Sequence, residues 1–439
     1  MTGDYLRNIT PDSVSGILLA LEGVGGCVAL LNGPSGCKFY HSSVSDNQMI
    51  RQLEFDPLNF PVKWYFGQPR VPCTYLDNGD YVYGSEEKIR EAMEFFRDEL
   101  PFSWLFVVNS PGAALIGDDL AGLAEQILPD RKVMVIETPG FSETVSAGYT
   151  RAGLAFLDAM AARGLVQPKG EFTREGRAPR VNLIGHCLFQ RNLTGDVEEM
   201  ERLFALMGVE VNCVFLGGSR AEACEQLGNA DLNVVVWSEY GVAIAKRLEE
   251  LTGVPYYVCT PPPVGFASAE KMLKETAELL GADPEPVLDE SGRARARCYA
   301  MISRMNSLTG MPDGVPYAAE GRASELLAYV EFLTGYLGMV PDALSLLDPE
   351  EGPALDALRT RLAGLRREDA LSRAPEDSRA QLVFASANML ARMKFLGKDF
   401  SGIETGLPTF GYYDVIPKTH LGIRGGMLLV EMVLNGLRL

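Results

Sequence analysis

Histidine and paired cysteine are both scarce in this chain of 439 residues. Only three histidines occur, His41, His186 and His420, which argues against a metal site built mainly from imidazoles. The eight cysteines include no Cys-x-x-Cys pair and no zinc-finger spacing, and they are too few and too scattered for a disulfide framework. Any metal bound by this chain is therefore expected to be held by thiolates.

Basic residues and long apolar runs are also lacking. The net charge is −18, which argues against nucleic acid as the main partner, because phosphate binding needs clustered lysine and arginine. No apolar run approaches the roughly 20 residues that span a bilayer, and the segment 1–11 is too short and polar for a signal peptide. We therefore expect a soluble cytoplasmic protein with no membrane partner.

Short apolar runs alternate with polar turns and helical patterns along most of the chain. With 47% hydrophobic residues, the chain can bury a large core in roughly two to four domains. The spacing is typical of parallel βα units and predicts an α/β fold. The predicted strands are Val28–Leu31, Trp104–Asn109, Lys132–Glu137, Val181–Gly185, Glu210–Phe215, Leu232–Trp237 and Pro255–Val258.

Three units of similar design are expected, with no short tandem repeat. The first covers residues 1–175 and ends in a charged, glycine-containing linker. The second covers 176–290, and the third covers 291–439. Within the third unit, residues 348–378 are rich in charge and proline, which predicts a solvated helical insertion.

Cys37 occupies the most informative position in the chain. It follows the predicted strand Val28–Leu31 and the turn residues Gly33-Pro34-Ser35-Gly36, where open α/β sheets place their ligands. A phosphate loop is rejected, because Cys37 replaces the glycine before Lys38, and Phe39 stands where a hydroxyl is needed. Backbone N–H groups at such a turn favour a thiolate that binds metal. The alternative is that Cys37 is a small buried hydrophobic residue.

The order and spacing of several motifs resemble those of nitrogenase component 1 and its relatives over nearly the whole chain. That superfamily includes a cofactor-assembly scaffold, the dark-operative protochlorophyllide reductase and the reductive cyclase of coenzyme F430 biosynthesis. The resemblance implies three Rossmann-like domains with parallel sheets around a central cleft, in a dimer with an iron–sulfur cluster at the subunit interface. The motifs are Gly33-Pro34-Ser35-Gly36-Cys37, residues 80–88, Ile116-Gly117-Asp118-Asp119, residues 192–196, residues 230–255 and residues 420–426.

Departures from the family pattern limit what the resemblance implies. In nitrogenase subunits three cysteines bind the interface cluster, and Cys37 matches one of them. The earlier position falls near Asp12 and the later one on Ser110. The cysteine that anchors the nitrogenase cofactor aligns with Trp237, and the anchoring histidine falls near Gly411. No nitrogenase-type molybdenum cofactor is therefore expected. Nitrogen fixation by this chain alone is not expected either.

Three cysteines are candidate ligands of an iron–sulfur cluster. Cys27 begins the strand whose end leads to Cys37, so the two lie roughly 15 Å or more apart at about 3.3 Å per residue and do not share one cluster. Cys73 precedes a stretch that approaches the dimer interface in the family. Cys37 and Cys73, doubled by a two-fold axis, supply the four thiolates of a [4Fe–4S] cluster. The remaining cysteines are expected in the core: Cys187, Cys213, Cys224, Cys259 and Cys298.

The central cleft has weaker candidate residues. His420, Arg424 and Lys418 offer cationic groups to an anionic ligand, or else they cap a helix or pair with Asp414. Trp237 forms the floor of the pocket or only packs. Separately, Asp118 and Asp119 resemble the family motif beside the cluster, but a helix-capping role is favoured for both.

The leading functional prediction is a nitrogenase-like reductase component, an oxidoreductase that is not itself a nitrogenase. A separate ATP-dependent iron protein would deliver electrons to the interface [4Fe–4S] cluster, for reduction of a substrate or metallocofactor in the cleft. The partner across the interface is a second copy or a sister subunit. Two alternatives remain open: a non-catalytic scaffold for metallocluster assembly, and a Rossmann-type ligand-binding protein with a structural Cys37.

Overall fold

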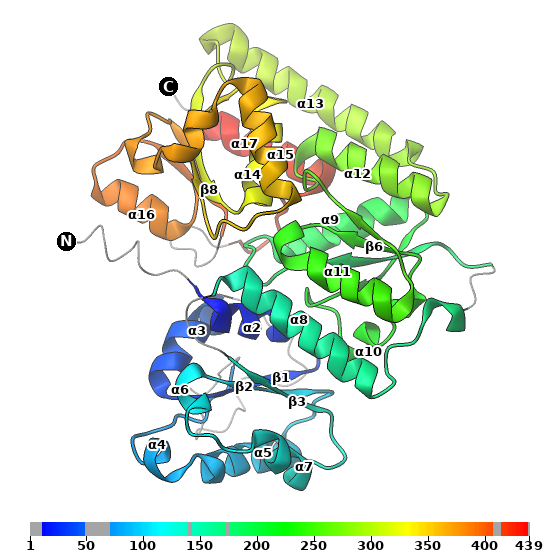
Figure 1. Ribbon diagram of the computed structural model, residues 1–439. Coiled ribbons are helices and arrows are strands. Elements are labelled where there is room, and N and C mark those ends of the chain that lie inside the picture. The colour runs from blue at the N-terminus through cyan, green and yellow to red at the C-terminus, as the bar shows by residue number, and fades with distance from the viewer. Residues whose placement is uncertain (1–10, 49–70, 139–142, 173–175, 407–413, 438–439) are drawn as a thin grey trace.

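Three parallel sheets follow one another along the chain. The computed structural model describes residues 11–48, 71–138, 143–172, 176–406 and 414–437, apart from the side chains of 42–48 and 171. Figure 1 shows the sheets in chain order from the bottom of the view to the top. The predicted α/β class with three Rossmann-like units is confirmed, and each predicted strand is found within two residues of its expected ends. No helix in the described ranges is long and apolar enough to cross a bilayer.

The N-terminal sheet has the strand order β1-β2-β3. Continuous apolar strands form here because both faces of the sheet are covered by helices. In Figure 1, α5 and α7 lie below the sheet, whereas α2 and α8 lie above it. The elements are α2 (Ser13–Glu22), β1 (Val28–Asn32), α3 (Ser35–Gln48), α4 (Asp80–Tyr83), α5 (Glu86–Glu99), β2 (Leu105–Asn109), α6 (Pro111–Ala114), α7 (Leu120–Ile127), β3 (Val133–Glu137) and α8 (Val145–Ala162).

The second sheet has the order β5-β4-β6-β7. Because β4 pairs with β5 on one side and β6 on the other, the topology reverses between β4 and β6, where such sheets bind ligands. The elements are β4 (Arg180–Ile184), α9 (Leu193–Leu206), β5 (Glu210–Val214), α10 (Ala221–Cys224), β6 (Leu232–Val235), α11 (Ser238–Thr252), β7 (Tyr256–Val258), α12 (Gly265–Leu280) and α13 (Glu285–Thr309), with short 3₁₀ turns at Lys169–Glu171 and Leu227–Asn229.

The third sheet has the order β11-β10-β8-β9. The elements are β8 (Pro316–Gly321), α14 (Ala323–Tyr329), which continues as a π-helical turn (Val330–Thr334), β9 (Val340–Leu346), α15 (Pro353–Leu365), β10 (Leu382–Ala385), α16 (Ala387–Phe395), β11 (Ser401–Glu404) and α17 (Gly422–Gly436). Two 3₁₀ turns, Glu368–Ser372 and Pro375–Asp377, follow α15.

The segment 348–378 is helical as predicted, but it is not a solvated insertion. Its main helix, α15, buries Leu355, Leu358 and Leu362. Because β10 lies on the far side of β8 from β9, α15 belongs to the crossover that joins β9 to β10. The predicted unit boundary at 290/291 falls inside the continuous helix α13, so that helix links the second and third sheets without a break.

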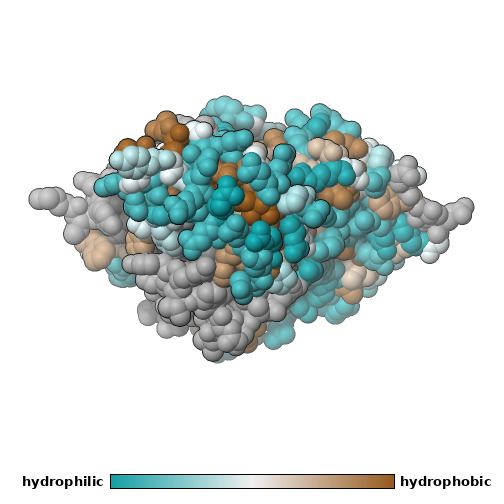
Figure 2. Space-filling model, turned by 90° about the horizontal axis from the view of Figure 1, so that it is seen from below, coloured by the Kyte–Doolittle hydropathy of each residue, from teal (hydrophilic) through white to brown (hydrophobic). Residues whose placement is uncertain are grey.

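One apolar core is shared by all three sheets. Alternate residues of β1 point to opposite faces, so Ala29 and Leu31 join the shared core, whereas Val28 and Leu30 face α5 and α7. The third sheet repeats this division, with Leu382 in the shared core and Val383 in a separate outer cluster. The described surface seen from below in Figure 2 is mainly hydrophilic, with small separated hydrophobic groups, in keeping with the net charge of −18.

Candidate metal centre and interdomain cleft

Cys37 and Cys73 both lie beside Gly33, beyond the carboxyl end of β1. Cys37 is in the first turn of α3 and is partly exposed. Cys73 forms a parallel bridge with Leu31 of β1, and its buried Sγ donates a hydrogen bond to the Gly33 carbonyl oxygen over 3.2 Å. A Cβ placed on Gly33 would lie 3.5 Å from the Cβ of Cys37. The structure thus brings together the two cysteines that the sequence singled out.

The two thiols differ in their surroundings. Burial raises the pKa of the Cys73 thiol to about 12, and the positive charge of Lys38 opposes this rise. Lys38 is itself only 5% exposed, which is unusual for a lysine. Cys73 is therefore protonated without a metal, and iron would have to displace both its proton and its bond to Gly33. Cys37 is the more accessible of the two.

His41, one helical turn after Cys37, pairs with Asp12, a contact that sequence reasoning missed. The ring Nδ1 lies 3.1 Å from Asp12 Oδ1 and 3.3 Å from Ser15 Oγ. Burial lowers the pKa of His41, but hydrogen bonds to Asp12 and Cys37 outweigh it and raise the pKa to about 9. The available signal was the spacing of four residues between Cys37 and His41, which places both on one face of a helix.

Exposed apolar side chains surround this end of the sheet. They lie on α3, on α4 and after α6, three segments found along the left edge of the lower sheet in Figure 1. Tyr81 is close enough to both thiols for their charges to raise its pKa, although burial is the larger cause. Exposed groups of this kind mark interaction surfaces. They are Phe39, Tyr40, Tyr81, Val82, Tyr83 and Leu115.

The two aspartates of the Gly-Asp-Asp motif bind helix ends. Asp118 Oδ2 accepts hydrogen bonds from the backbone N–H and the hydroxyl of Ser85, the residue before α5. Asp119 Oδ1 accepts from the Gly122 N–H and caps α7. Both contacts are the helix-terminal roles favoured from the sequence.

Cys27 lies away from the other two candidates. It precedes β1, so it lies at the opposite end of that strand from Cys37. Burial raises its pKa to about 12, and its charged neighbours are Glu222 and Arg220 rather than the cations near Cys73. The other five cysteines are buried, as expected for core residues: Cys187, Cys213, Cys224, Cys259 and Cys298.

Buried polar atoms without partners gather after β4 and β6. Both ring nitrogens of His186, Nε2 of Gln190, Nε1 of Trp237 and the hydroxyl of Tyr240 have no hydrogen-bond partner among the described residues. A Cβ on Gly185 would lie 2.6 Å from the Trp237 carbonyl oxygen, so the two loops touch. Since buried polar groups are nearly always paired, such a group indicates a place for water or a ligand. Of these residues, only Trp237 was predicted to line the cleft.

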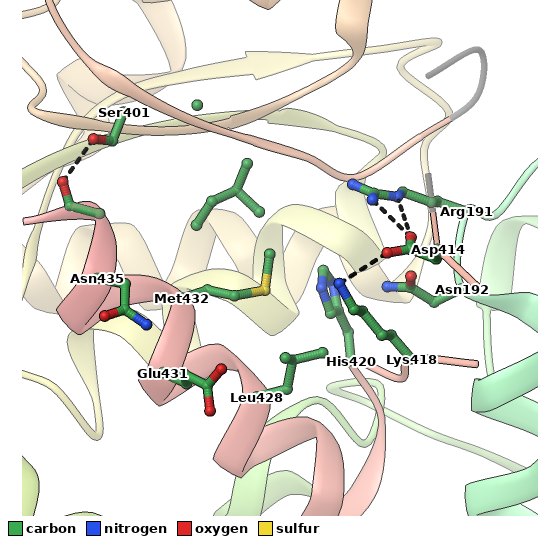
Figure 3. A pocket seen from close by; sticks show the side chains of 13 residues that line it. Arg191, Asn192, Ser401, Asp414, Lys418, His420, Leu428, Glu431, Met432 and Asn435 are labelled. Atoms are coloured by element: carbon green, nitrogen blue, oxygen red, sulfur yellow. Dashed lines mark hydrogen bonds and ion pairs between the residues drawn. The ribbon is translucent and has the colours of Figure 1, made fainter. Parts of the chain in front are cut away.

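A cavity of about 430 Å³ lies between α17, β11 and residues 191–192 (Figure 3). Lys418 and His420 line it, whereas Trp237 and Arg424 do not. Lys418 pairs with Asp414 at 2.9 Å, and Arg424 extends toward Glu199, with 3.7 Å between the charged atoms. The three predicted cations are therefore not gathered around one ligand.

The ring of His420 is buried. Its Nδ1 lies 3.0 Å from the hydroxyl of Tyr329, and burial lowers its pKa to about 4. Asp196 fixes the loop by accepting from the His420 N–H and the Thr419 hydroxyl. The low pKa disfavours a protonated ring, so the cationic alternative for His420 has less support, and the packing that buries the ring cannot be read from its neighbours in sequence.

A family model described as "Nitrogenase component 1 type Oxidoreductase" matches residues 13–438. The chain belongs to this family. The solved structure "Nitrogenase Cp1 at pH 6.5" has the same fold, with a TM-score of 0.74 and 19% identity over 97% of this chain and 91% of that one.

Curated relatives match a shorter part of the chain, and those named here are subunits of light-independent protochlorophyllide reductases. The one from Synechococcus sp. (strain WH7803) is 30% identical over an alignment of 256 residues that covers 55% of this chain and 46% of that protein. The one from Methylobacterium radiotolerans is 28% identical over 248 residues, with 55% and 44% covered. The match thus spans about half the length of these relatives.

At two positions where nitrogenase subunits have a cluster-binding cysteine, this chain has a residue that caps a helix. Asp12 caps α2 by accepting from the backbone N–H groups of Val14 and Ser15, and Ser110 caps α6. Gly411, at the predicted histidine position, lies outside the described residues. Within the described ranges, no group of three or more His, Cys, Asp or Glu residues is arranged to hold a metal ion. Cys37 and Cys73 form a pair rather than a complete site.

Proposed function

We propose that this chain is one subunit of a nitrogenase-like reductase, in which Cys37 and Cys73 provide half of the ligands of a [4Fe–4S] cluster shared between two subunits. The observation that carries the proposal is the convergence of two thiols beside Gly33, at an edge bordered by exposed aromatic residues. When bound, such a cluster supplies one-electron transfer, which none of the 20 side chains performs readily.

The residues around Gly33 fit a thiolate-bound group of this kind. A [4Fe–4S] cluster takes four cysteine thiolates, and one chain brings two of them together. Lys38 and His41 place positive charge beside Cys73 and Cys37, which offsets the negative charge of thiolates. An interface between two chains supplies the other two ligands and covers the apolar residues Phe39 and Tyr83.

The cleft is the proposed place for the substrate or a metallocofactor. In this proposal it includes the loops after β4 and β6, where the second sheet reverses its topology and the unpartnered groups of His186, Gln190 and Tyr240 would form hydrogen bonds to the ligand. We propose an ATP-dependent iron protein as the electron donor, in line with the family resemblance. Because all eight cysteines are free, the reducing cytoplasm is the proposed compartment.

Iron analysis of anaerobically purified protein tests the proposal. The expected value is about four iron atoms per dimer, with a visible absorption typical of [4Fe–4S]. Cys37→Ala abolishes the cluster and Cys73→Ala lowers or abolishes it, whereas the matched control Cys27→Ala leaves the iron content unchanged. A Cys73→Ala protein with a full, spectroscopically normal cluster would overturn the two-cysteine ligation in favour of a sister subunit that supplies three ligands.

Assembly and turnover complete the test. If the cluster crosses a two-fold axis, binding it only to the dimer lowers the dimer dissociation constant by mass action. Sedimentation should therefore show weaker dimers after chelation or exposure to oxygen. A monomer with an intact cluster contradicts this arrangement. Substrate turnover with an ATP-dependent iron protein as electron donor would support a reductase over an assembly scaffold. Protein that contains no iron in any state would support a ligand-binding role instead.

A further inference from the structure

Helix α13 carries a mostly apolar seam along its whole length, but the body of the protein covers only the first part of it. Successive seam positions are alternately four and three residues apart, the heptad spacing of paired helices. The first four positions are buried, whereas Met301 and Leu308 are 56% and 77% exposed and Met305 is partly buried. The seam consists of Val287, Ser291, Ala294, Cys298, Met301, Met305 and Leu308.

The ion pairs that tie α13 to other helices lie in its first half. Glu290 pairs with Arg202 of α9, and Arg295 pairs with Glu270 of α12, both at 2.9 Å. Among the described residues, the side-chain hydrogen bonds of 296–309 stay within the helix and the turn that ends it. In Figure 1, α13 runs along the upper edge of the molecule. The second half of the helix is therefore open to a partner.

Arginines border the exposed part of the seam in an otherwise acidic protein. Residues 291–312 contain four arginines and no aspartate or glutamate, against a net charge of −18 for the chain. Arg297 and Arg304 each precede an exposed seam residue, Met301 or Leu308, by four positions and so lie beside it on the helix surface. Both arginines are exposed, and neither has an ion pair within the described part of the chain. A charged row and an apolar row thus run side by side, each repeating after about 10.5 Å.

We propose that this surface, formed by Arg297, Met301, Arg304 and Leu308 and called here the α13 face, binds an acidic amphipathic helix of a partner protein. Apolar side chains of the partner helix cover Met301 and Leu308, and carboxylates seven residues apart pair with the two arginines. Methionine adapts its shape to what it contacts, which suits a docking surface. The inference does not depend on the proposed iron–sulfur cluster.

Charge favours a separate partner over a second copy of this chain. A two-fold contact brings the same surface of both copies together. Because residues 291–312 have no carboxylate, two α13 faces would oppose each other without a partner for Arg297 or Arg304. An anionic membrane is disfavoured as well, since a chain with a net charge of −18 is repelled by it. An acidic helix offers both the apolar cover and the opposite charge.

The test uses the full chain and a synthetic helical peptide of about three heptads, with leucine at the seam positions and glutamate beside them. Repulsion between the glutamates keeps this peptide from pairing with itself. Fluorescence anisotropy should show binding that weakens as salt is added. Arg297→Glu/Arg304→Glu should raise the dissociation constant about tenfold, because two ion pairs are replaced by repulsion. The matched control Lys246→Glu/Lys398→Glu makes the same change of charge at exposed lysines, on α11 and just after α16, and should bind like the wild type.

Several results would overturn the inference. They are an acidic peptide that does not bind, a peptide with lysine in place of glutamate that binds equally well, and an equal loss of affinity in the control variant. Leu308→Ser should also weaken binding, and unchanged affinity would refute the apolar contact. If Arg297→Glu/Arg304→Glu does not fold, Arg297→Gln/Arg304→Gln decides, because unchanged affinity in that variant refutes the ion pairs.

The same charge reversal distinguishes other occupants of the α13 face. If it dissociates an assembly of the wild-type chain in sedimentation, the face is a contact between copies and the acidic partner is refuted. If the wild type sediments with phosphatidylserine vesicles and the reversed variant does not, the face binds a membrane instead. We expect the reversal to change neither result.

Discussion

A glycine on each of two crossing helices brings α2 and α8 into backbone contact. A Cβ on Gly148 would lie 2.0 Å from the Ser13 carbonyl oxygen, and one on Gly16 would lie 2.1 Å from the Val145 oxygen. Real Cβ contacts essentially never fall below 3.0 Å, so Gly148→Ala requires the helices to separate by about 1 Å. Nine residues of α2 are buried, which leaves that helix no free direction in which to move.

The expected net effect is a loss of about 2 kcal/mol. Overpacking costs up to about 3 kcal/mol, and alanine recovers about 1 kcal/mol through its higher helix propensity. The matched control is Gly292→Ala in α13, where the new Cβ meets no atom within 4 Å beyond its chain neighbours and the adjacent helix backbone, and the residue is exposed. That variant should gain up to about 1 kcal/mol. Calorimetry should thus show the melting temperature Tm lowered by a few degrees in one variant and slightly raised in the other. Equal shifts of the same sign would refute the reasoning.

Two other predictions concern pH and metal content. Burial lowers the pKa of His186 to about 4 from 6.5, so the folded state resists protonation and stability is lost as pH falls from about 6.5 through 4. At about 1.36 kcal/mol per pKa unit, the full effect on the free energy of unfolding is about 3 kcal/mol. Between pH 7 and pH 4.5 the Tm of His186→Leu should therefore fall by less than the Tm of the wild type. An equal fall in both proteins would contradict the lowered pKa of His186. Elemental analysis should find no stoichiometric molybdenum or vanadium, because Trp237 replaces the anchoring cysteine. Chelation-resistant heterometal would show that other ligands exist.

Much of the fold was predictable because its strands are short continuous apolar runs. The reason is visible in β1, where Leu31 faces the shared core and Leu30 faces α5 and α7, so neither face can be polar. The position of Cys37 after this strand followed from the same pattern. Its proximity to Cys73 depends on a bridge to Leu31 across more than 40 residues of sequence, and only the family resemblance indicated it.

The rest depended on tertiary packing. The low pKa of His420 could not be predicted from the sequence, because the neighbours that bury the ring come from other elements. Residues 348–378 were predicted to be solvated because of their many charged residues. The apolar residues Leu355, Leu358 and Leu362 among them form the buried face of α15. His41 was overlooked because a lone histidine has no meaning until Asp12, from another helix, is found against it.

The apolar core shared by the three sheets bears on how such a chain can change over evolutionary time. The first and third sheets each have an outer apolar layer of their own, whereas the buried apolar residues of the second sheet all belong to the shared core. Deleting one sheet or replacing it by recombination would expose the inner faces of its neighbours to water. We therefore expect divergence in chemistry at the carboxyl ends of the strands, beyond which Cys37 and His186 lie, while the three-sheet body is inherited as a single piece.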